Sequence, residues 1–413
     1  MEVMTVSKLE ELIQELCPDG VEYKCFGEMA IIVRGASPRP IKSFITTDPD
    51  GVNWIKIGDV KPGSKYITET VEKITPDGAK KSRFVKEGDF ILSNSMSFGR
   101  PYIMKTQGCI HDGWLAISHF DNYFISDFLY HLLSSNMYQQ EMRKKASFGG
   151  AVQNLNADIV RDLKMPVVPL PVQSEIVRIL DSFIELTAEL TAELTARKKQ
   201  YEYYRDELLT PNENVTAVEL GEVCAFVRGP FGGALKKEIF QPKGYAVYEQ
   251  QHAIYRTLDF RYFIDEKKYN ELKRFSVKSG DIIVSCSGTI GKTFVIPEDA
   301  PKGVINQALL KLTPYKELNV FYLQYFFENT ISKILNGVAR GGAIKNVPSV
   351  EELKKIKIPL PPLEVQERLV QVLDNFEAIC SDLSIGLPAE IEARQKQYEY
   401  YRDKLLTFKE ASV

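Results

Sequence analysis

KQYEYYRDELLT at residues 199–210 recurs as KQYEYYRDKLLT at residues 396–407, with eleven of the twelve positions identical. The other matched pairs are PVVPLPVQSEIVRILDSF (166–183) with PLPPLEVQERLVQVLDNF (359–376), KEGDFILSNSMSFG (86–99) with KSGDIIVSCSGTIG (278–291), GGAVQN (149–154) with GGAIKN (341–346), and FGEMAIIVRG (26–35) with LGEVCAFVRG (220–229). Because the offset within every pair stays between 192 and 197 residues, the chain consists of two copies of one unit, 1–210 and 211–413.

Both copies end in a segment with the apolar spacing of a long helix. Apolar and aromatic residues alternate at spacings of four and three through 172–209, which predicts a heptad seam, and prolines flank this segment. The second copy repeats the seam with two adjacent spacings of four around Gly386, which predicts a stutter in one helix. The predicted helix-pairing or subunit-docking residues are Ile176, Leu180, Phe183, Leu190, Leu194, Tyr201, Tyr204, Leu208, Leu369, Leu373, Phe376, Leu383, Ile391, Tyr398, Tyr401 and Leu405.

We expect the two helices to pair as an antiparallel coiled coil with pseudo-twofold symmetry, although each seam packing on its own domain is an alternative. A helix over 172–209 would be about 57 Å long at about 1.5 Å per residue. Its LTAE, LTAE, LTAR repeats at 186–197 could set a length, or could be a low-complexity helix of strong helix formers.

Each unit is predicted to be a mixed α/β globule followed by its helix. The expected strands are 52–60, 84–92 and 109–118 in the first unit and 245–249, 275–284, 293–296 and 304–312 in the second, with helices at 124–146 and 318–336. The predicted domains are a first globule at 1–165, a first long helix at 166–210, a second globule at 211–358 and a second long helix at 359–413.

The composition is that of a globular protein of two or three domains, with 44% hydrophobic and 26% charged residues in 413. Six scattered cysteines and only four histidines make a structural zinc site improbable and favour a reducing cytoplasm, and neither a secretory signal nor a membrane span is expected. The net charge of the chain is −3. Residues 30–110 nevertheless carry a net charge of +5 (13 Lys and Arg − 8 Asp and Glu), and residues 225–315 also carry +5 (14 − 9). Such positive segments suit a nucleic-acid surface, although a chance imbalance of charge on solvated faces would give the same numbers.

The two copies diverge most at 36–85 and 230–277, which suggests two sites that do the same job on different targets. Hydroxyls, backbone amides and cations in glycine loops bind phosphate, and Arg, Gln and Asn pair with base edges, although such loops are also common as simple turns. The candidate DNA-binding residues are Arg34, Ser37, Arg39, Lys56, Ser93, Asn94, Ser95, Ser97, Arg100, Lys144, Lys145, Gln153 and Asn154 in the first unit, and Arg228, Lys236, Lys237, Gln250, Gln251, His252, Ser285, Ser287, Thr289, Lys292, Arg340, Lys345 and Asn346 in the second. His252 is equally compatible with a surface residue.

The motifs of an enzyme are incomplete. Gly291-Lys292-Thr293 resembles the end of a P-loop, but Cys286 stands where the leading glycine is required. The sequence contains neither an NPPY-like tetrapeptide of an adenine methyltransferase nor a Ser-His-Asp ordering. No catalytic residue and no metal ligand is therefore predicted.

These features together resemble the specificity subunit of a type I restriction-modification system. The twin QYEYYRD-LLT helix ends, the entries PLPVQSEIVRIL and PLPPLEVQERLVQVL, the LTAE repeats, WIKIGDV (54–60), and the strand-loop pair GDFILSNS and GDIIVSCSG carry the resemblance. It implies two target-recognition domains that each read half of a split double-stranded DNA sequence. It also implies helices that space the domains and dock two methylation subunits, which use S-adenosylmethionine, and restriction (translocase/nuclease) subunits, which use ATP and magnesium; this chain itself would hold no cofactor. The rival hypotheses are a coiled-coil adaptor without DNA specificity and, third, a stand-alone nuclease or methyltransferase.

Overall fold

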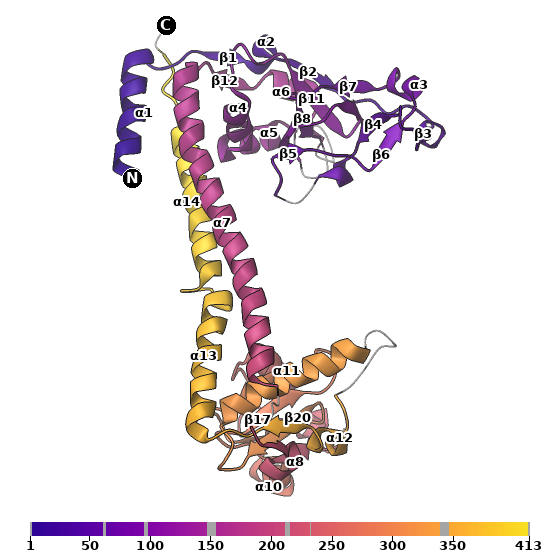
Figure 1. Cartoon of the computed structure of the whole chain (residues 1–413), viewed down its shortest axis with the longest axis vertical. Coiled ribbons are helices and arrows are strands. Elements are labelled where there is room, and N and C mark those ends of the chain that lie inside the picture. Colours follow the sequence, from indigo (N-terminus) through magenta and orange to yellow (C-terminus); the bar gives the residue numbers. More distant parts are fainter. Residues whose placement is uncertain are drawn as a thin grey trace. The chain divides into compact units, whose positions relative to one another are not determined.

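The computed structural model describes residues 2–60, 63–94, 98–146, 154–210, 215–231, 233–338 and 347–411. The chain divides into two compact units, Met1–Leu190 with Glu390–Val413 and Thr191–Ala389. Each unit contains one α/β globule, a part of the long helix α7 and a part of the C-terminal helical region (Figure 1). The mixed α/β fold with two tandem units is therefore confirmed.

Helix α7 runs from Leu170 to Leu208 and confirms the predicted helix at 172–209. The second copy differs, because its helix is divided into α13 (Leu363–Ser381) and α14 (Leu387–Leu405). The Asp382 carboxylate accepts hydrogen bonds from the backbone N–H groups of Ser384 and Ile385, which replaces helical bonding at this point. Leu383 is 77% exposed in this turn, so the predicted continuous stutter and the place of Leu383 in the seam were wrong.

Aromatic side chains join these helices inside each unit. In the first unit the rings of Phe183 on α7 and Tyr401 on α14 stack with centroids 5.4 Å apart. In the second unit Tyr201 and Tyr204, near the end of α7, lie 6.2 and 6.0 Å from the ring of Phe376 on α13. Since the beginning of α7 meets α14 and its end meets α13, the partner helices run antiparallel to α7, as the seams predicted.

The described part of the first globule holds two five-stranded sheets, ordered β2-β11-β8-β9-β5 and β3-β6-β4-β10-β7, and a separate β1–β12 pair. Phe90 and Leu92 of β8 face a core under helix α4, whereas Ile91 packs in the core on the other side of the strand. Strand β8 is thus buried on both faces, which explains its uninterrupted apolar sequence. The strands are β1 (Tyr23–Cys25), β2 (Ile31–Arg34), β3 (Ile45–Thr46), β4 (Val52–Ile55), β5 (Tyr66–Ile67), β6 (Glu72–Ile74), β7 (Arg83–Val85), β8 (Phe90–Ser93), β9 (Pro101–Met104), β10 (Gly108–Ile110), β11 (Trp114–Ser118) and β12 (Lys164–Pro166).

The second globule repeats this plan with smaller sheets among its described residues, β14-β20-β17-β18, β16-β15-β19 and the pair β13–β21. Ile282 and Val284 of β17 face the core under helix α11, and Ile283 faces the other core, as in β8. The strands are β13 (Ala217–Glu219), β14 (Cys224–Arg228), β15 (Tyr245–Tyr248), β16 (Phe263–Ile264), β17 (Ile282–Ser285), β18 (Thr293–Val295), β19 (Gly303–Ile305), β20 (Leu309–Pro314) and β21 (Lys357–Pro359).

Helices α4 and α11 pack on the large cores of their globules. The helix predicted at 124–146 is interrupted at Ser135, whose backbone is extended, and the helix predicted at 318–336 is α11. The helices other than α7, α13 and α14 are α1 (Glu2–Leu16), α2 (Phe26–Met29), α3 (Pro76–Ala79), α4 (Ser126–Ser134), α5 (Asn136–Ala146), α6 (Ala157–Arg161), α8 (Leu220–Val223), α9 (Gln250–Tyr255), α10 (Glu266–Glu271), α11 (Val320–Val338) and α12 (Val350–Lys354).

Glycine is required at one matched position of the two globules. A Cβ atom on Gly35 would overlap the carbonyl oxygen of His111, and one on Gly229 would overlap that of Asn306. Both glycines end the repeated VRG motif that leads into the divergent segment of each copy. The repeat thus preserves the point where the chain leaves the shared framework.

Candidate nucleic-acid interface

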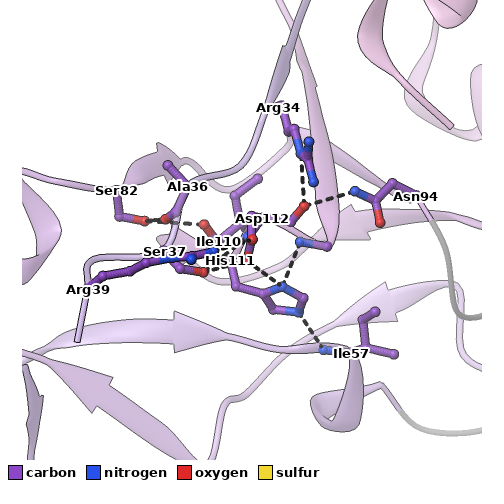
Figure 2. Close-up of polar contacts among 11 residues, drawn as sticks. Arg34, Ala36, Ser37, Arg39, Ile57, Ser82, Asn94, Ile110, His111 and Asp112 are labelled. Atoms are coloured by element: carbon purple, nitrogen blue, oxygen red, sulfur yellow. Dashed lines mark hydrogen bonds and ion pairs between the residues drawn. The ribbon is translucent and has the colours of Figure 1, made fainter. Parts of the chain in front are cut away.

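Asp112 is the centre of a polar cluster in the first globule, directly after β10. Its carboxylate accepts a 2.6 Å hydrogen bond from the Ser37 hydroxyl and lies 3.6 Å from the Arg39 guanidinium (Figure 2). Its backbone carbonyl accepts hydrogen bonds from Arg34 Nε at 3.1 Å and Asn94 Nδ2 at 2.8 Å. The hydrogen bond from Ser37 lowers the pKa of Asp112, so this carboxylate is ionised. Its carboxylate and its backbone carbonyl together contact four predicted DNA-binding residues.

His111 fixes the same loop from beneath. Its Nδ1 accepts a 2.7 Å hydrogen bond from the backbone N–H of Gly113, and its Nε2 lies 3.3 Å from the backbone nitrogen of Ile57 (Figure 2). Burial lowers the pKa of His111 more than the neighbouring Asp112 raises it. Each ring nitrogen of His111 faces a backbone N–H donor, so a second proton on the ring would point at a donor and not at an acceptor. The imidazole is therefore neutral, and its role is structural.

A groove with a volume of about 1010 Å³ is lined by four residues of this cluster, Ser37, Arg39, His111 and Asp112, and by neighbouring side chains. Lys56 on its wall forms a 2.7 Å ion pair with Glu72, and Arg39 on its rim is exposed. The groove therefore presents cations, which suit phosphate, beside carboxylates, which can accept from the amino groups of cytosine or adenine. It is lined by Ser37, Pro38, Arg39, Pro40, Ile41, Lys42, Ile45, Trp54, Lys56, Glu72, His111 and Asp112.

The second globule presents its predicted contacts differently. The Gln250 side-chain nitrogen donates to the carbonyl and the hydroxyl of Ser287, both at 2.6 Å, and so joins helix α9 to the loop after β17. Gln251 donates to the Asp259 carbonyl at 3.3 Å. The exposed predicted contacts of this globule are Arg228, Lys236, Lys237, Thr289 and Lys292.

Four predicted contacts are enclosed in the globules, which corrects their assignment to a DNA-facing surface. Ser93 and Ser285 are fully buried at matched positions, and each hydroxyl accepts from the backbone N–H after its loop, at Arg100 and Lys292. Asn94 is buried by its bond to Asp112. These buried polar side chains stabilise the fold of the globules, because a buried polar group requires a hydrogen-bond partner inside the protein.

His252 is the fourth, and the prediction that it could equally be a surface residue was also wrong. Its ring is fully buried and stacks on Phe260 with centroids 4.5 Å apart. Its Nδ1 accepts from the Glu249 backbone N–H at 2.8 Å, and its Nε2 lies 3.1 Å from the Asp259 carbonyl. Because both ring nitrogens have partners inside the globule, this histidine is a packing element.

The remaining predicted contacts divide into two groups. Arg100, Lys144 and Asn154 are exposed, while Lys145 forms a 3.0 Å ion pair with Glu141 and donates to the Asp162 carbonyl at 3.2 Å. The predicted residues that lie outside the described residues are Ser95, Ser97, Gln153, Arg340, Lys345 and Asn346.

Comparison with known proteins decides the family. Residues 18–197 and 212–393 each match the type I restriction modification DNA specificity domain. The chain belongs to this family of DNA specificity domains. It is 32% identical over 408 residues to a putative type I restriction enzyme specificity subunit of Haemophilus influenzae, covering 94% of this chain and 96% of that protein. It is 38% identical over 251 residues to the EcoR124I/EcoR124II specificity subunit of Escherichia coli, covering 59% of this chain and 61% of that protein.

Solved structures share the fold of this DNA specificity domain chain. A chain from a study of complex assembly and conformational transition of the type I R-M system superposes with a TM-score of 0.69 at 17% identity, covering 94% of this chain and 98% of that one. The HsdS subunit from Thermoanaerobacter tengcongensis gives a TM-score of 0.57 at 18% identity, covering 95% and 97%. At these identities the likeness concerns the fold alone.

The sequence analysis of this DNA specificity domain chain missed four polar residues that line the groove, Lys42, Glu72, His111 and Asp112. The segment His111-Asp112-Gly113 separates the apolar strands β10 and β11. This polar segment between two apolar strands was the one sequence feature that could have indicated His111 and Asp112.

Within the part of the chain that the structure describes, no group of three or more His, Cys, Asp or Glu side chains could hold a metal ion. None of its described helices is long and apolar enough to cross a membrane.

Proposed function

We propose that this chain is the non-catalytic DNA-recognition subunit of a type I restriction-modification complex, and that it reads a two-part target with its two globules. The observation that carries the proposal is the pair of specificity-domain matches, each of which includes one globule and its following helix. The globules share buried frameworks but differ in their exposed loops, which suits two readers of different half-sites.

The first globule reads its half-site with the groove around Asp112. Arg39 and Lys56 contact phosphates or guanine, and Asp112 accepts from an amino group on a base edge in the major groove. The second globule uses the exposed cations Arg228, Lys236 and Lys292 together with the polar loop held by Gln250. Phosphate contacts supply salt-dependent affinity, and base contacts supply the sequence preference.

The helices hold the two readers at a set separation and bind the partner subunits. We assign 1–165 and 211–358 to the recognition domains and 166–210 and 359–413 to the spacer regions. Two methylation subunits supply S-adenosylmethionine chemistry, and restriction subunits supply ATP- and magnesium-dependent chemistry. This assembly works inside the cytoplasm, where host DNA is the substrate.

The test is to mix the chain with the methylation subunit of its own system and to map the methylated bases on random-sequence DNA. A two-part consensus with an unread gap supports the proposal. Methylation without any consensus, or binding of the partner without DNA preference, would instead support a coiled-coil adaptor.

A domain exchange tests the assignment of one half-site to one globule. Replacing residues 36–150 by the corresponding segment of a relative should change one half of the consensus and leave the other half and the gap unchanged. A change in both halves would contradict independent reading by the globules.

A further inference from the structure

His131 joins the first globule to both helices of its unit. It lies on α4, is fully buried, and its Nε2 is 2.9 Å from the Asp181 carboxylate on α7. Its Nδ1 is 2.9 Å from the Tyr398 hydroxyl on α14. The imidazole on α4 of the globule therefore contacts two helices outside the globule, α7 and α14.

Lys65 completes this contact from the sheet side of the globule. Its ammonium is 2.5 Å from the Asp127 carboxylate, 3.7 Å from that of Asp181, and 5.0 Å from the centre of the Tyr130 ring. Burial lowers the pKa of His131, so the ring is neutral. Burial alone would raise the pKa of Asp181, but the hydrogen bond from His131 and the charge of Lys65 outweigh it and lower that pKa.

The second unit builds an equivalent contact from different residues. Asp374 occupies the position of Asp181 in the matched segments, and it lies 2.6 Å from the hydroxyl of Tyr325 on α11. The same hydroxyl is 2.8 Å from Glu377, also on α13. It carries a single proton, so it donates to one carboxylate at a time.

Arg256 takes the part of Lys65 in this unit. Its guanidinium lies 3.7 Å from Glu377 and 3.5 Å from Glu328 on α11, so it spans the two helices. Its backbone has a φ of 51° at the end of α9, a conformation that a non-glycine residue keeps only when its surroundings hold it there. In both units an aspartate on a helix of the spacer region thus binds one polar side chain of the globule. A cation pairs with that aspartate in the first unit and with the neighbouring Glu377 in the second.

We propose that His131 and Tyr325 are positioning residues that fix the orientation of each globule on its helices and thereby limit the gap accepted between the half-sites. This inference rests on the proposed function. Apolar packing is non-directional, so it tolerates small rotations, whereas a charge-assisted hydrogen bond requires one geometry. Neighbouring base pairs differ by about 3.4 Å along the duplex and by roughly 35° around it, so small rotations of a reader change which gap fits.

The decisive variant is Tyr325→Phe, which removes one hydroxyl and keeps the ring. The full chain with its methylation subunit is assayed on duplexes that carry both mapped half-sites separated by the native gap or by one base pair more or fewer. We expect the preference for the native gap to fall by about tenfold, the factor that corresponds to about 1.4 kcal/mol, with both half-site sequences unchanged. Tyr248→Phe is the matched control, because its buried hydroxyl donates to the Pro301 carbonyl within the same globule.

Conservative and truncating changes at the aspartate separate positioning from folding. Asp374→Asn keeps an acceptor for the Tyr325 hydroxyl and should retain the gap preference, whereas the double change Asp374→Ala with Glu377→Ala removes both acceptors on α13 and should lose it. His131→Phe, which keeps a ring without hydrogen bonds, should broaden the gap in the same way from the first unit. An unchanged gap preference in Tyr325→Phe and in the double variant, or an equal loss of methylation at every gap, would overturn the inference. A wild-type complex without a two-part consensus would refute the proposed function instead.

Discussion

Gln173 and Gln366 stand at the same position of the two repeats and make the same three hydrogen bonds. The side-chain oxygen of each accepts from a backbone N–H next to the start of a globule helix, Ile125 for Gln173 and Asn319 for Gln366, at 2.9 and 2.8 Å. The side-chain nitrogen of each donates to two backbone carbonyls. Both residues are fully buried, so each repeat has the same buried hydrogen bonds between its globule and its helix.

Truncation of either glutamine should destabilise its own unit. Gln173→Ala leaves one N–H and two carbonyls, all of them partly or fully buried, without their partner, which costs about 2–4 kcal/mol in total. Gln173→Glu keeps the acceptor but places a charge there, so it should be at least as damaging. Thermal unfolding of the full chain measures the effect, and Gln139→Ala, which removes hydrogen bonds from a half-buried glutamine within the first globule, is a milder comparison. A Gln173→Ala protein with an unchanged Tm would contradict this account.

The sequence was sufficient for the architecture because repetition and periodicity are linear signals. The offset between the QYEYYRD motifs located both helical regions, and the 172–209 seam located α7 to within two residues at each end. The break at Asp382 escaped the same reasoning, since it depends on a side chain that captures backbone N–H groups and not on apolar spacing.

The candidate contacts were less predictable than the fold. Ser93 and Ser285 have the composition of phosphate-binding loops, but their side chains turn inward, and only three-dimensional packing decides the direction. Asp112 is remote in sequence from Ser37 and Arg39, which it binds, so no local motif could reveal the cluster. Most residues that line the groove nevertheless come from the divergent segment after the VRG motif, so its role in DNA contact stays a prediction.

Acidification should weaken the first unit before the second. Burial lowers the pKa of both His111 and His131, and both lie in the first unit. Below the ordinary histidine value of about 6.5 the unfolded chain binds protons that the folded chain does not, so stability falls with falling pH, by at most about 1.4 kcal/mol per pH unit for each histidine. The lowered pKa of Asp181 acts only at lower pH, because its stabilisation is lost as pH falls below the ordinary aspartate value.

Hydrogen exchange of the full chain at pH 7.5 and 5.5 measures this difference unit by unit, after correction for intrinsic exchange rates. We expect protection to fall in the first unit, and His131→Gln, which removes one titrating ring, should reduce the fall. An equal loss of protection in both units would show that the two histidines do not control it.

Removal of groove cations should weaken DNA binding without regard to sequence if they contact phosphate. Arg39→Ala removes an exposed guanidinium whose partner, Asp112, remains held by Ser37, so the fold should persist. Each lost phosphate contact should reduce the slope of log affinity against log salt by about 0.9. Titrations of the assembled complex at several salt concentrations check this, with Lys404→Ala on α14 as a charge-matched control outside the groove. A changed consensus with an unchanged salt slope would show instead that Arg39 reads a base.

Deletion of one LTAE repeat should shorten the gap that the complex accepts. The repeats lie in α7, the continuous helix that connects the two units in the chain, and Thr187, Leu190 and Leu194 are half-buried while the residues between them are exposed. Removing residues 190–193 takes out about 6 Å of helix and a rotation of about 40° beyond a full turn, and it restores the same pattern of half-buried positions. At about 3.4 Å per base pair this corresponds to a gap shorter by about two base pairs, with both half-sites unchanged. Methylation of duplexes of graded gap length measures the shift. As a control, replacing the repeat by four alanines keeps the length of the helix and should leave the preferred gap unchanged. The same preferred gap in the deletion variant would show that α7 does not set the spacing.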